Sequence, residues 1–194
     1  MGQVMIDFCP RAFVDRYDIS EDDKQLLVDE LFEGNANWVL SDWGMIDETE
    51  VARRAFPRIP RRMHDIAMDA AVNWSVPIIP IDGAADMVRA IKGAGYGLYL
   101  LSNAGYTHRE YWPTVPGSEY FDGVVVSAYE KLLKPDPAIY RRLLERFGLR
   151  AEECIFTDDR QVNLAGAETV GIKSVLFRSP EDFLRKIADL NICI

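Results

Sequence analysis

The sequence contains 194 residues, of which 48% are hydrophobic, and it carries a formal net charge of -9 at pH 7 with a pI near 4.8. This length and apolar content suffice for one compact core with a small appended domain and argue against a disordered chain. The acidic balance argues against a nucleic-acid-binding protein, which needs a basic face, and no apolar run approaches the ~20 residues that span a bilayer.

The amino terminus has no basic segment followed by an apolar one, so it does not resemble a secretion signal and we expect a cytoplasmic protein. The three cysteines, Cys9, Cys154 and Cys193, are odd in number and far apart. Their spacing favours neither a disulfide framework nor a metal-binding cysteine pair. We therefore expect no membrane and no nucleic acid among the partners, and the sequence leaves the oligomeric state open.

The first part of the chain, from about residue 10 to residue 74, predicts helices only. Apolar residues such as Leu27 and Leu31 recur there at helical spacing. Ser20 precedes three acidic residues, as a helix N-cap does, and Gly34 is placed to end that helix. Asp47 begins a second segment with the same start signal.

After a proline-rich stretch at residues 76–80 the pattern changes to strands that alternate with helices. In chain order we expect a helix at 84–94, strands at 97–101 and 123–126, a helix at 137–147, a strand at 154–157, a helix at 162–170, a strand at 174–177 and a helix from Pro180. Strands that are nearly continuously apolar and alternate with helices predict an α/β fold with a parallel sheet covered on both faces. Ligands of such sheets bind beyond the carboxyl ends of the strands.

Polar side chains suited to a phosphate and a divalent metal follow these strands. Ser102 and Asn103 could donate hydrogen bonds to phosphate oxygens, and Lys134 could neutralise the phosphate charge. Asp158 and Asp159 stand side by side at a strand end, and oxygen ligands next to a phosphate suit Mg²⁺. Each of these groups alone fits a structural role equally well, as a polar loop start, a solvated lysine or a helix-capping aspartate. Their combination in this order is what indicates a site.

Three segments resemble motifs two, three and four of the haloacid dehalogenase superfamily. They are Leu100-Leu101-Ser102-Asn103, Leu132-Leu133-Lys134-Pro135-Asp136-Pro137-Ala138-Ile139-Tyr140 and Phe156-Thr157-Asp158-Asp159-Arg160-Gln161-Val162-Asn163. The chain is especially similar to helical-capped phosphatases of the α-D-glucose-1-phosphate phosphatase type, and the similarity covers nearly its whole length. The resemblance implies a Rossmann-like core with an inserted helical cap. Residues 1–9 would be a remnant of the first core strand region, residues 10–80 the cap and residues 81–194 the core.

The resemblance also implies a Mg²⁺-dependent phosphatase that acts on small phosphorylated metabolites, such as sugar phosphates, through an aspartyl-phosphate. Carried over by motif, Ser102 and Asn103 would bind the transferring phosphoryl group, and Lys134 would steady that group and the nucleophile. Asp158 and Asp159 would hold the metal.

The first motif is where the chain departs from this family. In this branch the motif is a strand that ends in the attacking aspartate, whereas residues 2–11 resemble only its downstream part, so that the aspartate would fall just before Met1. Asp7 is the less favoured alternative nucleophile, because it lies too close to Pro10 for the motif. Without the strand, two neighbouring strands lose a pairing partner, so we expect a truncated start. A complete sheet that includes residues 1–6 would instead favour Asp7.

Other functions remain open at this point. The chain could be a non-catalytic relative that binds phosphate or a partner protein, a receiver-like signalling domain or a dehalogenase. Chain order disfavours the receiver, which places its acidic pair on the first strand, and adjacent carboxylates favour a metal-dependent phosphatase over a dehalogenase. We expect Trp38, Trp43 and Trp74 to pack inside the cap half, with Trp38 or Trp43 as alternatives at a substrate entrance, and we assign His108 no role.

Overall fold

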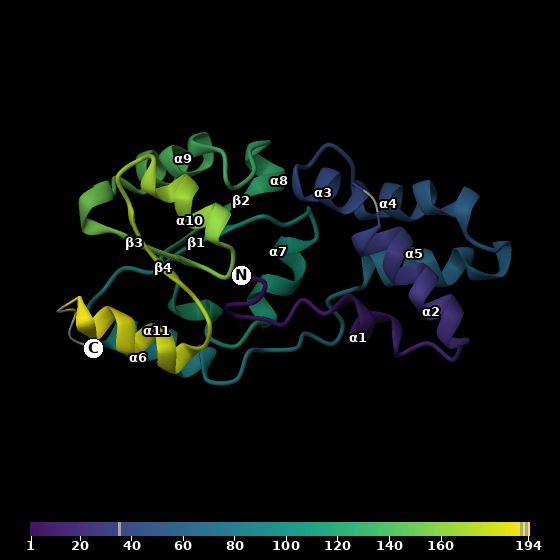
Figure 1. The fold of residues 1–194 in the computed structure, drawn as a ribbon, viewed down its shortest axis with the longest axis horizontal. Coiled ribbons are helices and arrows are strands. Elements are labelled where there is room, and N and C mark those ends of the chain that lie inside the picture. The colour runs from purple at the N-terminus through teal and green to yellow at the C-terminus, as the bar shows by residue number, and fades with distance from the viewer. Residues whose placement is uncertain (35, 191, 193) are drawn as a thin grey trace.

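A computed structural model describes residues 1–34, 36–190, 192 and 194. Figure 1 shows an α/β core on one side and a group of helices, the cap, on the other, with the N-terminal residues between them. Within the described residues no helix is long and apolar enough to cross a membrane. Cys9 and Cys154 are free thiols, and Cys193 lies outside the described residues.

The cap is helical, as predicted. It contains α1 (Pro10–Val14), α2 (Glu21–Val28), α3 (Asn37–Asp42), α4 (Glu48–Ala55) and α5 (His64–Val72), with a π-helical turn (Asp29–Glu33) after α2 and 3-10 turns (Phe56–Arg58 and Arg61–Met63) before α5. The predicted helix starts are confirmed: Ser20 Oγ accepts a hydrogen bond from Asp23 N at 3.2 Å and Asp47 Oδ1 accepts one from Glu50 N at 2.7 Å. Gly34 caps the π-helical turn that continues the first of these helices.

Aromatic rings form the part of the cap that faces the N-terminal residues. The Trp38 ring lies 4.7 Å from the Phe32 ring, and the Trp74 ring lies 5.2 Å from the Phe8 ring, centroid to centroid. The predicted packing role is therefore confirmed for these two tryptophans. It is wrong for Trp43, which is 42% exposed and whose indole N–H donates to the Lys131 carbonyl at 2.9 Å.

Apart from two short helices that were not predicted, His108–Tyr111 and Ser127–Glu130, the core helices and strands begin and end within about two residues of their predicted bounds. They are α6 (Ala84–Gly93), β1 (Tyr99–Ser102), α7 (His108–Tyr111), β2 (Gly123–Val126), α8 (Ser127–Glu130), α9 (Pro137–Phe147), β3 (Ile155–Asp158), α10 (Gln161–Glu168), β4 (Lys173–Leu176) and α11 (Pro180–Asp189). Asp136 Oδ1 caps α9 by accepting from Ala138 N at 2.8 Å, and Ser179 Oγ caps α11 by accepting from Asp182 N at 3.2 Å.

The strands are parallel, as predicted, and they form two pairs. β1 pairs with β2, with Ser102 opposite Val126, and β3 pairs with β4, with Asp158 opposite Leu176. Within the described residues no ladder joins one pair to the other. Residues 1–6 form a turn with isolated bridges from Ile6 to Gly2 and to Pro80, and they add no strand to either pair. The condition that would have favoured Asp7 is therefore not met.

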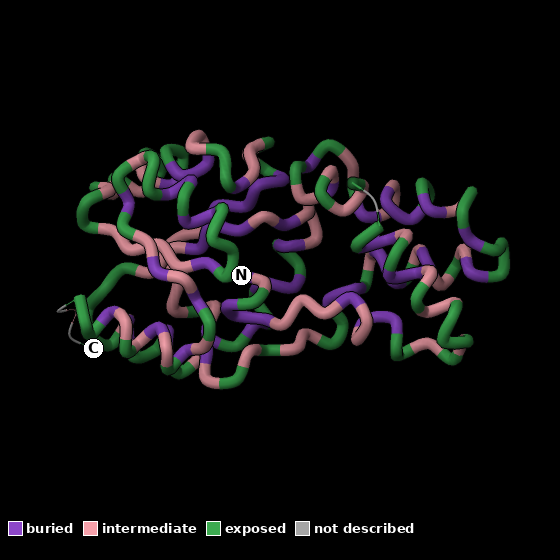
Figure 2. The backbone as a smooth tube through the Cα atoms, viewed as in Figure 1, coloured by how far each residue is buried: buried purple, intermediate pink, exposed green. Residues whose placement is uncertain are grey.

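The two strand pairs share the same covering helices and form one layer. Figure 1 shows α9 and α10 above the strands and α6 and α11 below them, and buried backbone lies between these helices in Figure 2. On one side, Leu101 of β1 and Phe156 of β3 pack in a common cluster with Tyr140 of α9. On the other, Leu100 and Val175 belong to a second cluster that also contains residues of α6, α11 and the N-terminal turn. The carboxyl ends of β1 and β3 thus meet at one edge.

Candidate active site

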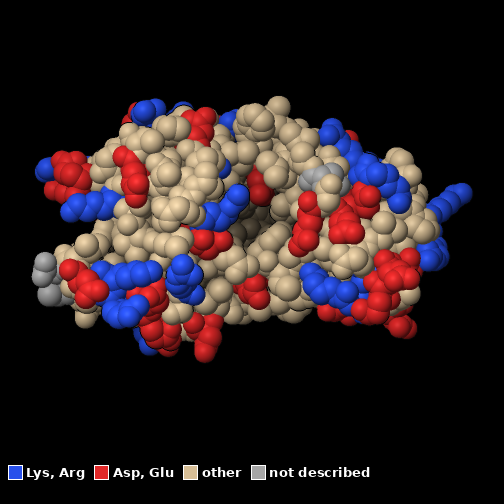
Figure 3. All heavy atoms as spheres, in the orientation of Figure 1, with Lys and Arg blue, Asp and Glu red and all other residues tan. Residues whose placement is uncertain are grey.

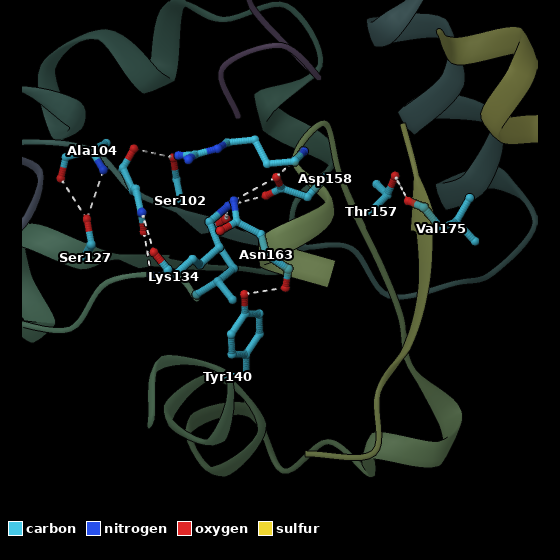
Figure 4. Close-up of polar contacts among 12 residues, drawn as sticks. Ser102, Ala104, Ser127, Lys134, Tyr140, Thr157, Asp158, Asn163 and Val175 are labelled. Carbon is cyan, nitrogen blue, oxygen red and sulfur yellow. Dashed lines mark hydrogen bonds and ion pairs between the residues drawn. The ribbon is translucent and has the colours of Figure 1, made fainter. Parts of the chain in front are cut away.

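A buried lysine connects the ends of the two strand pairs. Lys134 Nζ donates to Asp158 Oδ2 at 2.6 Å and to the Leu101 carbonyl oxygen at 3.0 Å (Figure 4). The Lys134 and Asp158 side chains are each only 5% exposed. The ammonium group therefore sits where β1 and β3 end, with its charge shielded from water and its position fixed by two acceptors.

Asn103 holds the backbone of this lysine. Its Nδ2 donates to the Lys134 carbonyl oxygen at 3.0 Å, and its Oδ1 accepts from Lys134 N at 2.9 Å. Both ends of the Asn103 amide are thus engaged with the chain. Ser102 is 2% exposed, and its hydroxyl donates to the Asn103 carbonyl at 3.3 Å. The loop after β1 consequently positions Lys134 as well as presenting polar groups of its own.

Asp158 is saturated with hydrogen-bond donors. In addition to Lys134, Asp158 Oδ1 accepts from Arg160 N at 3.0 Å and from Asn163 Nδ2 at 2.8 Å (Figure 4). Burial raises the pKa of Asp158, but the charge of Lys134 and these hydrogen bonds outweigh burial, and the pKa lies below its ordinary value. Asp158 is therefore ionised at neutral pH, and its oxygens hold Lys134 and the start of α10.

Asp159 is the accessible member of the pair. Within the described residues no other side chain forms a hydrogen bond or ion pair with its exposed carboxylate. Partial burial and the adjacent charge of Asp158 raise the pKa of Asp159. An exposed carboxylate that no cationic side chain of the described residues contacts directly fits a hard cation such as Mg²⁺. No group of three His, Cys, Asp or Glu side chains in the described residues is arranged to hold a metal.

The structure brings together the five residues of the predicted motifs, Ser102, Asn103, Lys134, Asp158 and Asp159, which we call the strand-end cluster. Asp7 does not join it. The Asp7 carboxylate accepts from Gln3 Nε2 at 3.1 Å, and its backbone N–H donates to Ile79 O at 2.8 Å.

The buried amino group of Met1 lies close enough to the strand-end cluster for the charges of that cluster to act on it. Burial and the charge of Lys134 lower the pKa of this amino group to about 5, against the opposing charges of Asp158 and Asp159. His108, to which the sequence assigns no role, is 2% exposed and stacks on Trp112. Burial and the nearby Met1 amino group lower the pKa of His108 to about 4, so the ring is neutral.

A cap segment, residues 41–48, contacts the core beside the cluster. Ser127 Oγ donates to the Asp42 carbonyl and accepts from Ala104 N at 2.9 Å, two residues after Ser102. The Glu48 side chain, buried at 4% exposure, accepts from Thr107 N at 3.1 Å and from Thr107 Oγ1 at 2.8 Å. Figure 3 shows a hollow between cap and core, with acidic atoms on its walls. No motif or periodicity marks these cap residues, because their role depends on how two distant segments meet.

Burial and the negative charge of Glu48 raise the pKa of Asp42 to about 7, against the attraction of Lys134. Since this folded-state pKa exceeds the ordinary value of 3.8, folding stability falls as pH rises from the ordinary value to about 7. We therefore expect Asp42→Asn to raise the free energy of unfolding by about 1–2 kcal/mol at about pH 8, discounted for partial exposure, and by less at about pH 5. Urea unfolding at both pH values checks this. An equal change at both would contradict the assignment of the charge to Asp42.

Comparison with known proteins agrees with this geometry. The model of haloacid dehalogenase-like hydrolases matches residues 8–171, and the chain belongs to this family. A haloacid dehalogenase family enzyme from Bacteroides thetaiotaomicron, solved as a magnesium complex, has a TM-score of 0.72 at 22% identity, with 96% of this chain and 94% of that chain covered. A predicted HAD-like hydrolase from Porphyromonas gingivalis has a TM-score of 0.72 at 18% identity, with 100% and 95% covered. These likenesses establish the capped α/β fold.

Curated relatives are similar in part. Flavin mononucleotide hydrolase 1 of Arabidopsis thaliana is 24% identical over 160 residues, which are 80% of this chain and 62% of that protein. A glyceraldehyde 3-phosphate phosphatase of Pyrococcus abyssi is 28% identical over 102 residues, which are 50% of this chain and 42% of that protein. The chain thus spans less than two thirds of the length of these relatives.

Proposed function

We propose that this protein is a Mg²⁺-dependent phosphatase of small phosphorylated metabolites that acts through an aspartyl-phosphate. The observation that carries the proposal is the fixed Lys134 ammonium at the joint end of β1 and β3, with the free Asp159 carboxylate beside it. Membership in a hydrolase family and relatives named as phosphatases support this choice over a purely binding role.

Each residue of the strand-end cluster has a proposed part. Lys134 neutralises the charge that builds up on the phosphoryl group and on the attacking carboxylate, and it can do so without rearranging because Asp158 and Asn103 already hold it. Ser102 lies at the same edge to donate to a phosphate oxygen. Asp159, with Asp158 behind it, offers the carboxylate oxygens that would hold Mg²⁺. Bound Mg²⁺ would supply a second positive charge on the phosphoryl oxygens.

We propose that the attacking aspartate stands on a further strand between β1 and β3, supplied by sequence upstream of Met1. The division of the core into two parallel pairs supports this, since an inserted parallel strand would satisfy the unpaired edges of both. Lys134 would lie at the end of such a strand, within reach of its last side chain. The aspartate oxygen would bond to phosphorus as the bond between phosphorus and the leaving-group oxygen breaks, and that oxygen would take a proton from water. Water would then hydrolyse the aspartyl-phosphate to phosphate and the free carboxylate.

Hydrolysis of p-nitrophenyl phosphate, with and without Mg²⁺, tests the proposal in this chain and in a chain extended upstream by an aspartate-bearing strand. We expect Mg²⁺-dependent activity in the extended chain and almost none in the 194-residue chain. If the short chain is active and the substitution Asp7→Asn abolishes that activity, the nucleophile is instead Asp7. Inactivity of both forms would contradict the proposal and favour a binding role.

A further inference from the structure

Asp42, the last residue of α3, carries a half-buried carboxyl group at the junction of cap and core. Within the described residues no hydrogen bond or ion pair involves this carboxyl group, although the charges of both Glu48 and Lys134 act on it. Lys134 is the residue proposed to meet the phosphoryl group. The cap therefore places the Asp42 carboxyl group, which has no hydrogen-bond partner among the described residues, close to Lys134.

The position of Asp42 is fixed by its own backbone and by its neighbours. Ser127 ties the Asp42 carbonyl to the loop that follows Ser102 (the Ser127–Ala104 contact is drawn in Figure 4). The next residue, Trp43, donates its indole N–H to the Lys131 carbonyl at 2.9 Å, and Tyr106 OH donates to the Gly44 carbonyl at 2.8 Å. These three contacts hold residues 42–44 against the core. Asp42 is consequently held in a fixed position at the junction of cap and core.

The fold gains little from a charge at this place. Burial and the charge of Glu48 disfavour the ionised form, and the charge of Lys134, which is already paired with Asp158, favours it less strongly. A residue that makes the folded state less stable is commonly retained because activity needs it. The same reasoning does not apply to Glu48, whose carboxylate is bonded twice to Thr107.

Hydroxyl groups without partners lie in the same region. Ser41 Oγ and Tyr111 OH are buried, at 1% and 5% residue exposure, and neither has a hydrogen-bond partner within the described residues. Tyr111 is close enough to Asp42 and Glu48 for both charges, together with burial, to raise its pKa well above the ordinary value. Ser41 immediately precedes Asp42, and its Oγ lies beside Gly105 in the loop after β1. Of these groups the carboxylate discriminates between ligands. When ionised it only accepts hydrogen bonds, so it suits a ligand hydroxyl, which can donate, better than a second anion, which cannot.

We propose that Asp42 is a specificity-determining residue that selects phosphate esters whose leaving group is neutral and hydroxylated, and rejects esters that carry a second anionic group. The inference rests on the proposed phosphatase function and names its substrate class. The Asp42 carboxylate accepts a hydrogen bond from a hydroxyl group of the correct leaving group. Against a carboxylate in the same place it acts by like-charge repulsion, which is only weakly screened in a partly buried site.

The matched substrates are glycerol 3-phosphate and 3-phosphoglycerate, in which a CH₂OH group of the first is replaced by a carboxylate in the second. Their kcat/KM values, and their Kd values from calorimetry without Mg²⁺, are compared for wild type and Asp42→Asn at about pH 8, where Asp42 is mostly ionised. We expect wild type to favour glycerol 3-phosphate by at least about tenfold and Asp42→Asn to reduce this ratio by about fivefold, mainly through tighter binding of 3-phosphoglycerate. The kinetic values are measured in the form of the protein that hydrolyses p-nitrophenyl phosphate.

Asp47→Asn is the control, because it removes the same charge from the exposed start of α4 while asparagine can still cap that helix. It should leave the ratio unchanged. If Asp42→Asn hydrolyses p-nitrophenyl phosphate and keeps the wild-type ratio of kcat/KM for the two matched substrates, the inference is overturned. The proposed function then still stands. Absence of both hydrolysis and binding for every ester would overturn both.

Discussion

Lys134→Ala is expected to lower kcat/KM for phosphate-ester hydrolysis by at least about 100-fold, as for the loss of one preorganised electrostatic stabiliser. It should also lower the free energy of unfolding by about 3 kcal/mol, because the substitution leaves the Asp158 charge buried without its partner. The rate is measured with p-nitrophenyl phosphate and the stability by urea unfolding. Retention of full activity would exclude Lys134 from the site.

Two further variants separate the catalytic effect of Lys134 from its structural one. Lys173→Ala removes an exposed lysine from β4 and should change neither quantity appreciably. The double variant Lys134→Met with Asp158→Asn removes both charges while keeping the volume of the buried pair, and it should recover most of the lost stability. Its activity should stay as low as that of Lys134→Ala. Recovery of activity together with stability would show that Lys134 acts only by supporting the fold.

Asp159→Asn is expected to abolish Mg²⁺-dependent turnover, leaving less than about 1% of the rate, while the protein stays folded. No side chain of the described residues forms a hydrogen bond or ion pair with this carboxylate, and Asp158 repels its charge, so the neutral amide costs little in native contacts. Activity is measured across a Mg²⁺ titration, and unfolding in urea provides the stability. We expect a free energy of unfolding equal to or slightly above that of wild type.

Asp65→Asn, an exposed change in the first turn of α5, is the charge-matched control and should retain wild-type activity. If excess Mg²⁺ restored full activity to Asp159→Asn, this carboxylate would contribute only to affinity. Full activity at ordinary Mg²⁺ would remove Asp159 from the proposed metal site.

The sequence predicted the core from residue 80 onward closely, because each element there has a local signal. Apolar runs such as residues 123–126 mark buried parallel strands, and the Asp136 and Ser179 caps mark where α9 and α11 begin. The strand-end cluster was predictable for the same reason. Its members follow strands directly or lie in the loop after one, so parallel topology alone brings them to one edge.

Features that depend on contacts between distant segments were beyond the sequence pattern. Nothing in the local sequence indicated that Trp43 would turn outward to Lys131 or that the Asn103 amide would be used on the Lys134 backbone. The cap acids Asp42 and Glu48 were missed likewise, since their neighbours come from loops more than fifty residues away. The division of the parallel strands into two pairs also depends on distant segments, because the described residues contain no strand that joins β1 to β3.

Calorimetric titration of Mg²⁺ in the presence of inorganic phosphate, on wild type and Asp159→Asn, most directly tests whether the strand-end cluster holds a cation next to a phosphoryl group. We predict saturable Mg²⁺ binding to wild type that phosphate strengthens and that Lys134→Ala weakens, and we predict its loss in Asp159→Asn. Identical titrations of wild type and Asp159→Asn would contradict a metal site at this strand edge.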